Sequence, residues 1–205
     1  MEIIVNFKTY KQGKDALDLA RVIQKFNSKV IVAVEATDIN LIKNKTKLKV
    51  YSQHVDDISK GKNTGFILPE AVKKAGAVGT ILNHSEHKIS NKEIKEIIDK
   101  CKKLNLKVVC CVPNLKEAKK IKKFKPYAIA FEDPKLIGTG KPVTEYKPEE
   151  IIKFVKLLND TNILPICGAG ISSKKDIITA KNLGCKGVLI ASAITNSNKT
   201  KIKEM

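Results

Sequence analysis

An acidic residue followed by a glycine-containing loop is the part of this sequence best suited to chemistry. The apolar run over residues 127–131 ends at Glu132, and residues 133–142 read DPKLIGTGKP. Glycine lets backbone N–H groups approach a ligand and absorbs large changes in φ and ψ. We therefore interpret Glu132 as a general base at the end of a buried strand, beside a hinged lid over residues 134–141 that closes over a small anion. Taken alone, the segment could also be an ordinary strand-to-helix turn.

Polar side chains follow two other apolar runs. Asn6 and Lys8 stand at the end of the first run, and His84 comes directly after the run that ends at Leu82, with Glu86 two residues further on. A single lysine is usually a solvated surface residue, and a single histidine is usually a satisfied polar group. Together with Glu132 they would supply a base, an imidazole and a fixed ammonium. His54 and His87 have no such placement, and we expect them to be structural or peripheral.

Two loops of small residues near the carboxyl end predict a phosphate site. Residues 167–172 read CGAGIS and residues 191–193 read ASA. Small residues let backbone amides crowd around an oxyanion, and a helix N-terminus adds positive potential. The sequence lacks a grouped set of metal ligands, and its GAG loop lacks the later glycine and the acidic residue of a dinucleotide fingerprint. We therefore expect no metal and no cofactor, and a base opposite a neutral donor suits proton abstraction beside a carbonyl.

The elements that must position these residues alternate between two kinds. Apolar, β-branched runs predict eight strands, over residues 3–7, 30–34, 49–52, 77–82, 107–112, 127–131, 163–166 and 187–190. Several lack apolar–polar alternation, as parallel strands buried on both faces do. Amphipathic segments between them predict helices, with a capping box at Ser90–Glu93 and another N-cap at Ser172 or Ser173. This pattern predicts an α/β fold, a (β/α)8 TIM barrel with its site at the carboxyl ends of the strands. An open doubly wound sheet is the alternative.

Composition narrows the function. The chain has 205 residues without a linker-like stretch, so we expect a single domain over residues 1–205. Its net charge of +18 is spread over most helical segments, and only 5% of residues are aromatic, which leaves little for base stacking. We expect no nucleic-acid partner, and a positive field that speeds encounter with an anionic metabolite.

Without an apolar membrane span or a signal segment, we expect a cytoplasmic protein that does not bind membranes. The five cysteines form no CxxC pair and are interpreted as small buried residues.

Five segments together resemble the triosephosphate isomerase family, in its compact archaeal form. They are, in order, Asn6-Phe7-Lys8, Asn83-His84-Ser85-Glu86, Glu132 with Leu136-Ile137-Gly138-Thr139-Gly140, Gly168-Ala169-Gly170-Ile171-Ser172, and Gly187-Val188-Leu189-Ile190-Ala191-Ser192. The resemblance implies interconversion of dihydroxyacetone phosphate and D-glyceraldehyde 3-phosphate through an enediolate, in glycolysis and gluconeogenesis. It also implies a homo-oligomer, either a tetramer or a dimer.

The same resemblance implies residue roles. Glu132 would move the proton between carbons. His84 would polarise the carbonyl and move protons between the oxygens, and Lys8 would supply fixed positive charge. Asn6 would help to place the substrate oxygens, and Glu86 would orient Lys8 or hold its loop. The remaining substrate-binding positions would contact the phosphate, mainly through backbone amides: Ile137, Gly138, Gly170, Ala191 and Ser192.

Three departures from the family pattern stand out. Residues 35–38 read EATD, so we expect the loop after the second strand to pack differently. Asp133 stands beside the base, where it would raise the pKa of Glu132 if it pointed inward, or else face solvent. Only residues 198–205 follow the last loop, so the eighth helix should be short or absent, and a neighbouring subunit would cover that flank. Another phosphate-binding barrel and a non-catalytic basic binding protein are the competing interpretations.

Overall fold

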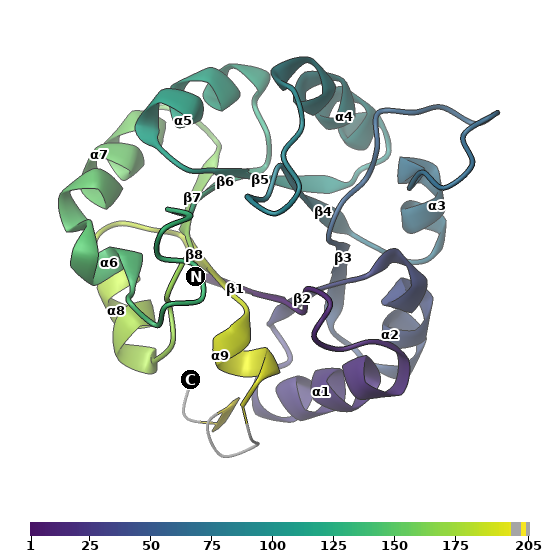
Figure 1. The fold of residues 1–205 in the computed structure, drawn as a ribbon, viewed down its shortest axis with the longest axis horizontal. Helices are drawn as coiled ribbons and strands as arrows, with labels where there is room; N and C mark the ends of the chain where they lie inside the picture. Colours follow the sequence, from purple (N-terminus) through teal and green to yellow (C-terminus); the bar gives the residue numbers. More distant parts are fainter. Residues whose placement is uncertain (198–201, 204–205) are drawn as a thin grey trace.

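Eight parallel strands close into a barrel in the order in which they occur along the chain (Figure 1). The computed structural model describes residues 1–197 and 202–203. The strands are β1 (Glu2–Asn6), β2 (Ile31–Val34), β3 (Lys49–Ser52), β4 (Gly79–Leu82), β5 (Lys107–Val112), β6 (Ala128–Phe131), β7 (Leu164–Cys167) and β8 (Gly187–Ile190). The predicted TIM barrel is confirmed, and the predicted strands differ from these only at their ends.

A ring of helices surrounds the barrel (Figure 1). It consists of α1 (Gly13–Phe26), η1 (Ala36–Asp38), α2 (Ile39–Lys45), α3 (Pro69–Lys74), α4 (Asn91–Lys103), α5 (Leu115–Ile121), η2 (Lys122–Phe124), α6 (Val143–Tyr146), α7 (Pro148–Leu158), α8 (Lys174–Asn182) and α9 (Ser192–Thr195). Each longer helix turns one apolar face inward; in α4 the buried residues are Ile94, Ile97, Ile98 and Cys101. This spacing of three and four residues is what the sequence pattern predicted.

The core has two layers because successive strand residues point to opposite faces of the sheet. One layer fills the barrel interior, with Ile4, Tyr51 and Ile81 among its members. The larger layer lies between the strands and the helices. Tyr51 needs the glycine at position 79, since a Cβ there would lie 2.6 Å from the tyrosine ring. The five cysteines are all buried free thiols, as expected.

Side chains cap the two helices that follow the loops of the His84 and Gly170 segments. Ser90 accepts from the backbone N–H of Glu93 and completes the predicted capping box of α4. Ser173, rather than Ser172, is the N-cap of α8, and Asp176 completes its box. Gly184, with φ at 97°, follows the last turn of α8. These caps fix where each helix begins relative to the strand end before it.

The loop after β2 is tied to the start of α1. Residues 36–38 form η1, and the buried Asp38 accepts a hydrogen bond at 3.0 Å from the backbone N–H of Gly13. The EATD segment therefore packs as a short 3-10 turn that braces the neighbouring loop.

The segment after β8 begins with the four-residue α9, which lies between α8 and α1 in the ring (Figure 1). Ile202 and Lys203 are helical, and Ile202 joins the main core. The prediction of a short or absent eighth helix also concerns residues 198–201 and 204–205, which lie outside the described residues. Among the residues described, no helix has both the length and the apolarity needed to cross a membrane.

Candidate active site

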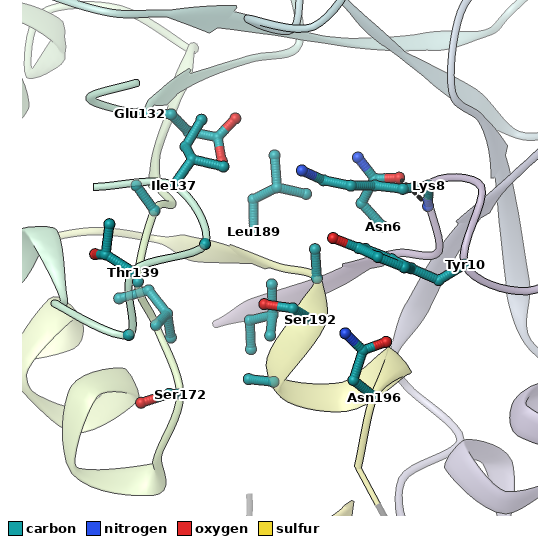
Figure 2. A pocket seen from close by; sticks show the side chains of 18 of the residues that line it. Asn6, Lys8, Tyr10, Glu132, Ile137, Thr139, Ser172, Leu189, Ser192 and Asn196 are labelled. Carbon is teal, nitrogen blue, oxygen red and sulfur yellow. Dashed lines mark hydrogen bonds between the residues drawn. The ribbon is translucent and has the colours of Figure 1, made fainter. Parts of the chain in front are cut away.

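A cavity of about 610 Å³ opens among the loops that follow the strands (Figure 2). Ten residues singled out in the sequence line it: Asn6, Lys8, His84, Glu86, Glu132, Ile137, Gly138, Gly170, Ala191 and Ser192. In Figure 2, Glu132 and Ile137 stand on one side of the cavity and Asn6 and Lys8 on the other. The barrel thus brings residues at or after the ends of β1, β4, β6, β7 and β8 to one place, whereas their individual roles remain predictions.

Glu132 is a buried acid with a poorly compensated carboxylate. The residue is 6% exposed, and its Oε2 has no hydrogen-bond partner among the described residues. Burial raises the pKa of Glu132, and the charges of His84 and Lys8 offset only part of this effect. Gly168 makes room for the side chain, since a Cβ there would lie 2.4 Å from Oε1. A buried carboxylate with few competing partners is well suited to accept a proton from carbon.

Cys111 is a neighbour of the base that the sequence analysis did not assign to the site. It belongs to the layer that fills the barrel interior, and the interaction of its thiol with the Glu132 carboxyl lowers the pKa of Glu132, which favours the charged form. Burial and the Glu132 charge raise the pKa of Cys111 well above its ordinary value, so the thiol stays protonated and can donate. The signal available in the sequence was its position next to the end of β5 on the inward-facing side.

His84 is held with a defined tautomer. The backbone N–H of Glu86 donates to Nδ1 at 3.2 Å, so in the neutral ring the proton sits on Nε2. Nε2 lies 3.5 Å from Oε2 of Glu132. Asn83 adopts φ of 57° and anchors the loop by donating to the backbone oxygen of Cys111 at 2.9 Å. The histidine therefore presents an N–H donor toward the cavity on the base's side.

Lys8 is fixed by its neighbours on three sides. Its backbone is left-handed, with φ of 46°, and its N–H donates to the Asn6 side chain at 2.9 Å. Its Nζ pairs with Glu86 at 2.5 Å, and Gln53 donates to its backbone oxygen at 2.8 Å. Asn6 thus uses its oxygen to hold the turn, which leaves its amide nitrogen for the cavity. The Glu86 contact matches one of the two roles that the sequence suggested for that residue.

Three backbone segments form the other end of the cavity. Gly138 and Gly170 have φ of 75° and 71°, and Ser192 is the first residue of α9. The N–H groups of a first helical turn lack partners within the helix and favour an anion. Ser172 contributes less than its position suggests, because its backbone N–H donates to Asp176 at 2.8 Å.

The lid over residues 134–141 is packed against the loop that follows β7. A Cβ at Gly170 would lie 1.9 Å from the backbone oxygen of Lys141, and the Val143 N–H donates to the Ala169 oxygen at 3.1 Å. Glycine at 170 is therefore required for this contact, in addition to any contact with phosphate.

Asp133 matches neither placement expected for it. It is buried, and its carboxylate turns to Lys147, with Oδ2 2.9 Å from Nζ, while Oδ1 accepts from the backbone N–H of Lys135 at 2.9 Å. Burial raises the pKa of Asp133, but these bonds and the Lys147 and Lys135 charges outweigh it and lower the pKa overall.

Several polar residues line the cavity without having been given a role from the sequence. Thr139 and Ser172 lie within the segments assigned to the lid and the phosphate loop, whereas Tyr10, Asn196 and Ser197 were missed. Tyr10 follows Lys8 closely in the same turn, which was a usable signal, whereas nothing in the sequence marks Asn196. His54 and His87 stack outside this cavity, with ring centroids 4.1 Å apart. Within residues 1–197 and 202–203, no group of three or more His, Cys, Asp and Glu side chains could hold a metal ion.

The fold and the cavity together define a class of protein: TIM-barrel enzymes that transfer a proton beside the carbonyl of a small phosphorylated molecule. The family model described as Triosephosphate isomerase matches residues 1–204. The chain belongs to the triosephosphate isomerase family, as its motifs predicted.

Individual relatives agree with this assignment. The chain is 37% identical to the triosephosphate isomerase of Methanocaldococcus jannaschii over 205 residues, covering 96% of this chain and 94% of the relative. It is 40% identical to that of Methanobacterium bryantii over 200 residues, covering 94% and 88%. The crystal structure of triosephosphate isomerase from Bartonella henselae has the same fold, with a TM-score of 0.75 at 19% identity and coverage of 98% and 96%.

Proposed function

We propose that this protein interconverts dihydroxyacetone phosphate and D-glyceraldehyde 3-phosphate by proton transfer through an enediolate, the step that serves glycolysis and gluconeogenesis. The observation that carries the proposal is the pairing of Glu132 with His84 across 3.5 Å, in a cavity whose opposite end is built from Gly138, Gly170 and the start of α9. A triose phosphate would place its carbonyl beside Glu132 and His84 and its phosphate beside these loops.

Each step then follows from a group in the cavity. Glu132 removes a proton from the carbon beside the carbonyl, while the Nε2–H of His84 donates to the carbonyl oxygen. Negative charge develops on the enediolate oxygens, where Lys8 and the His84 N–H stabilise it. His84 then moves a proton between the two enediolate oxygens: its Nε2–H protonates the former carbonyl oxygen, and the ring takes up the proton of the neighbouring hydroxyl. Glu132 returns its proton to the former carbonyl carbon, and the new carbonyl forms at the carbon that first lost a proton. The raised pKa of Glu132 favours this exchange, since it makes the carboxylate a stronger base.

The other predicted residues bind and enclose the substrate. Asn6 directs its amide toward the substrate oxygens, and Glu86 holds the Lys8 ammonium. Backbone amides of Gly138, Gly170, Ala191 and Ser192 receive the phosphate, and Ile137 covers it. Closing the lid excludes water, and this protects the enediolate from losing its phosphate.

Replacing the base tests this function directly. In a coupled assay of glyceraldehyde 3-phosphate conversion, Glu132→Gln should lower kcat by about 10²- to 10⁴-fold, because the amide cannot accept the proton. Glu117→Gln is the matched control, since Glu117 pairs with Lys88 at the surface, 2.9 Å away, and should leave kcat unchanged. Equal rates for wild type and Glu132→Gln would remove Glu132 from the mechanism.

The proposal extends to the domain organisation, location and assembly of the protein. The 205 residues form one domain in the cytoplasm, without nucleic-acid or membrane partners. The chain assembles as a homotetramer, or as a dimer, with a neighbouring subunit over the flank where α9 has only four residues. Multi-angle light scattering at micromolar concentration should give a mass two or four times that of the 22.7 kDa chain. A stable, fully active monomer would reject the oligomer.

A further inference from the structure

The residue directly before the lid, Asp133, forms a turn with the first residues of the lid. Asp133 follows the base directly; its backbone oxygen accepts from Leu136 N–H at 2.9 Å, and its Oδ1 accepts from Lys135 N–H at 2.9 Å. Thr139 continues the chain of turns by donating its hydroxyl to the Leu136 oxygen at 2.9 Å. These bonds make the lid a preformed unit, so its motion must be concentrated at its two ends.

The residue that binds the Asp133 carboxylate is held by the helices on the other side of the lid. Lys147 is the single residue between α6 and α7; its N–H donates to the Val143 oxygen at 2.8 Å and its oxygen accepts from Ile151 N–H at 3.1 Å. Its Nζ is 2.9 Å from Asp133 and 3.1 Å from Glu150. One ion pair therefore joins the start of the lid to the segment that follows its end.

The two ends of the lid are fastened by different means. The far end rests on the loop after β7, through Val143 N–H and the close approach of Lys141 to Gly170. The near end depends on a side-chain pair whose acid is 9% exposed and whose lysine is 35% exposed. The charged groups facing Asp133 are Lys147 and Lys135, and Glu150 shares Lys147. None of these side chains lines the cavity, so the pair can be changed without replacing a cavity residue.

We propose that Asp133 and Lys147 are positioning residues that anchor the first hinge of the lid and so keep it closed over the enediolate. The proposal rests on the proposed function, since it concerns the lid of the same site. Asp133 acts through its neighbour: its peptide follows that of Glu132, so a loosened hinge displaces both the lid and the base. A hinge that opens early exposes the enediolate to water and lets it release phosphate.

The experiment uses the full-length protein with Asp133→Asn, Lys147→Met, the double variant and Glu150→Gln as control. The Asp133→Asn change keeps a side-chain oxygen for the Lys135 N–H but removes the charge, whereas Glu150→Gln leaves the Asp133–Lys147 pair intact. Two readouts are taken: the fraction of turnovers that release inorganic phosphate, and amide hydrogen exchange of residues 133–141. Thermal unfolding of each variant shows whether it is folded, and Lys147→Met changes the pair from its exposed side.

Each single variant should raise the phosphate-release fraction by about three- to tenfold, the range expected for loss of a partly exposed charged hydrogen bond. Lid exchange should accelerate by a similar factor, the double variant should add little, and Glu150→Gln should change neither. Unchanged phosphate release together with unchanged lid exchange in either single variant overturns the proposal. If the wild type fails to isomerise the triose phosphates, the proposed function fails, while the exchange data still decide whether the pair anchors the lid.

Discussion

At the scale of single residues, the environment of Glu132 opposes the charge that its role requires. Burial raises its pKa above the ordinary value of 4.5, and Oε2 lacks a partner within the described part of the chain. Between 4.5 and the raised pKa, the folded state binds more protons than the unfolded state does. The free energy of unfolding therefore decreases as the pH rises through this window, and the site gains a strong base at a cost in stability.

Cys111 should tune this base. Because its thiol favours the charged carboxylate, Cys111→Ala should raise the pKa of Glu132 further. The acid limb of kcat/KM, which reports the free enzyme, should shift to higher pH, and Cys111→Ser should restore it. Cys110→Ala is the control, since that thiol packs in the outer core layer. A pH profile of Cys111→Ala that overlays the wild type would contradict the assignment.

At the scale of elements, the lid depends on a glycine in another loop. Gly170→Ala should lower kcat/KM by about 10- to 100-fold, since the new methyl group would meet the Lys141 oxygen and displace the lid. Gly140→Ala is a matched control, because Gly140 has the same φ of 71° but nothing lies within 4 Å of its Cβ position. Steady-state kinetics of the two variants separate the collision from backbone strain; equal losses would mean that strain alone is responsible.

Sequence patterns predicted elements and strand-end positions well, because both depend on local periodicity. Glu132, His84 and Lys8 were found since each directly follows an apolar run, and parallel strands deliver such residues to one rim. Contacts between loops could not be found in this way. The room that Gly168 leaves for Glu132 and the pairing of Asp133 with Lys147 depend on how loops approach in space. Asn196 also lines the cavity, but it could not be found from the sequence because it does not directly follow a strand.

At the scale of the whole molecule, the net charge of +18 should influence the rate of encounter with a phosphorylated substrate. Lys8 lines the cavity together with Glu86 and Glu132, so the attraction comes from the wider positive surface, and salt screens it over about 10 Å at 0.1 M. Raising the ionic strength from about 10 to about 300 mM should lower kcat/KM several-fold and leave kcat nearly constant. Titration with salt under pseudo-first-order conditions measures this. If kcat/KM were independent of salt, the surface lysines would not contribute to attracting the substrate.

The pairing of β1 with β8, which closes the barrel, determines when activity can appear during folding. β1 pairs with β2 on one side and with β8 on the other, and it carries Lys8 at its end. Lys8 is therefore synthesised among the first residues, but the cavity that it lines is complete only when β8 and the residues that follow it, Ala191 and Ser192, are in place. A chain in which β1 has not yet paired with β8 has no enclosed pocket. During refolding, the recovery of enzyme activity should therefore measure closure of the barrel, and it should come later than the recovery of the helical circular dichroism signal.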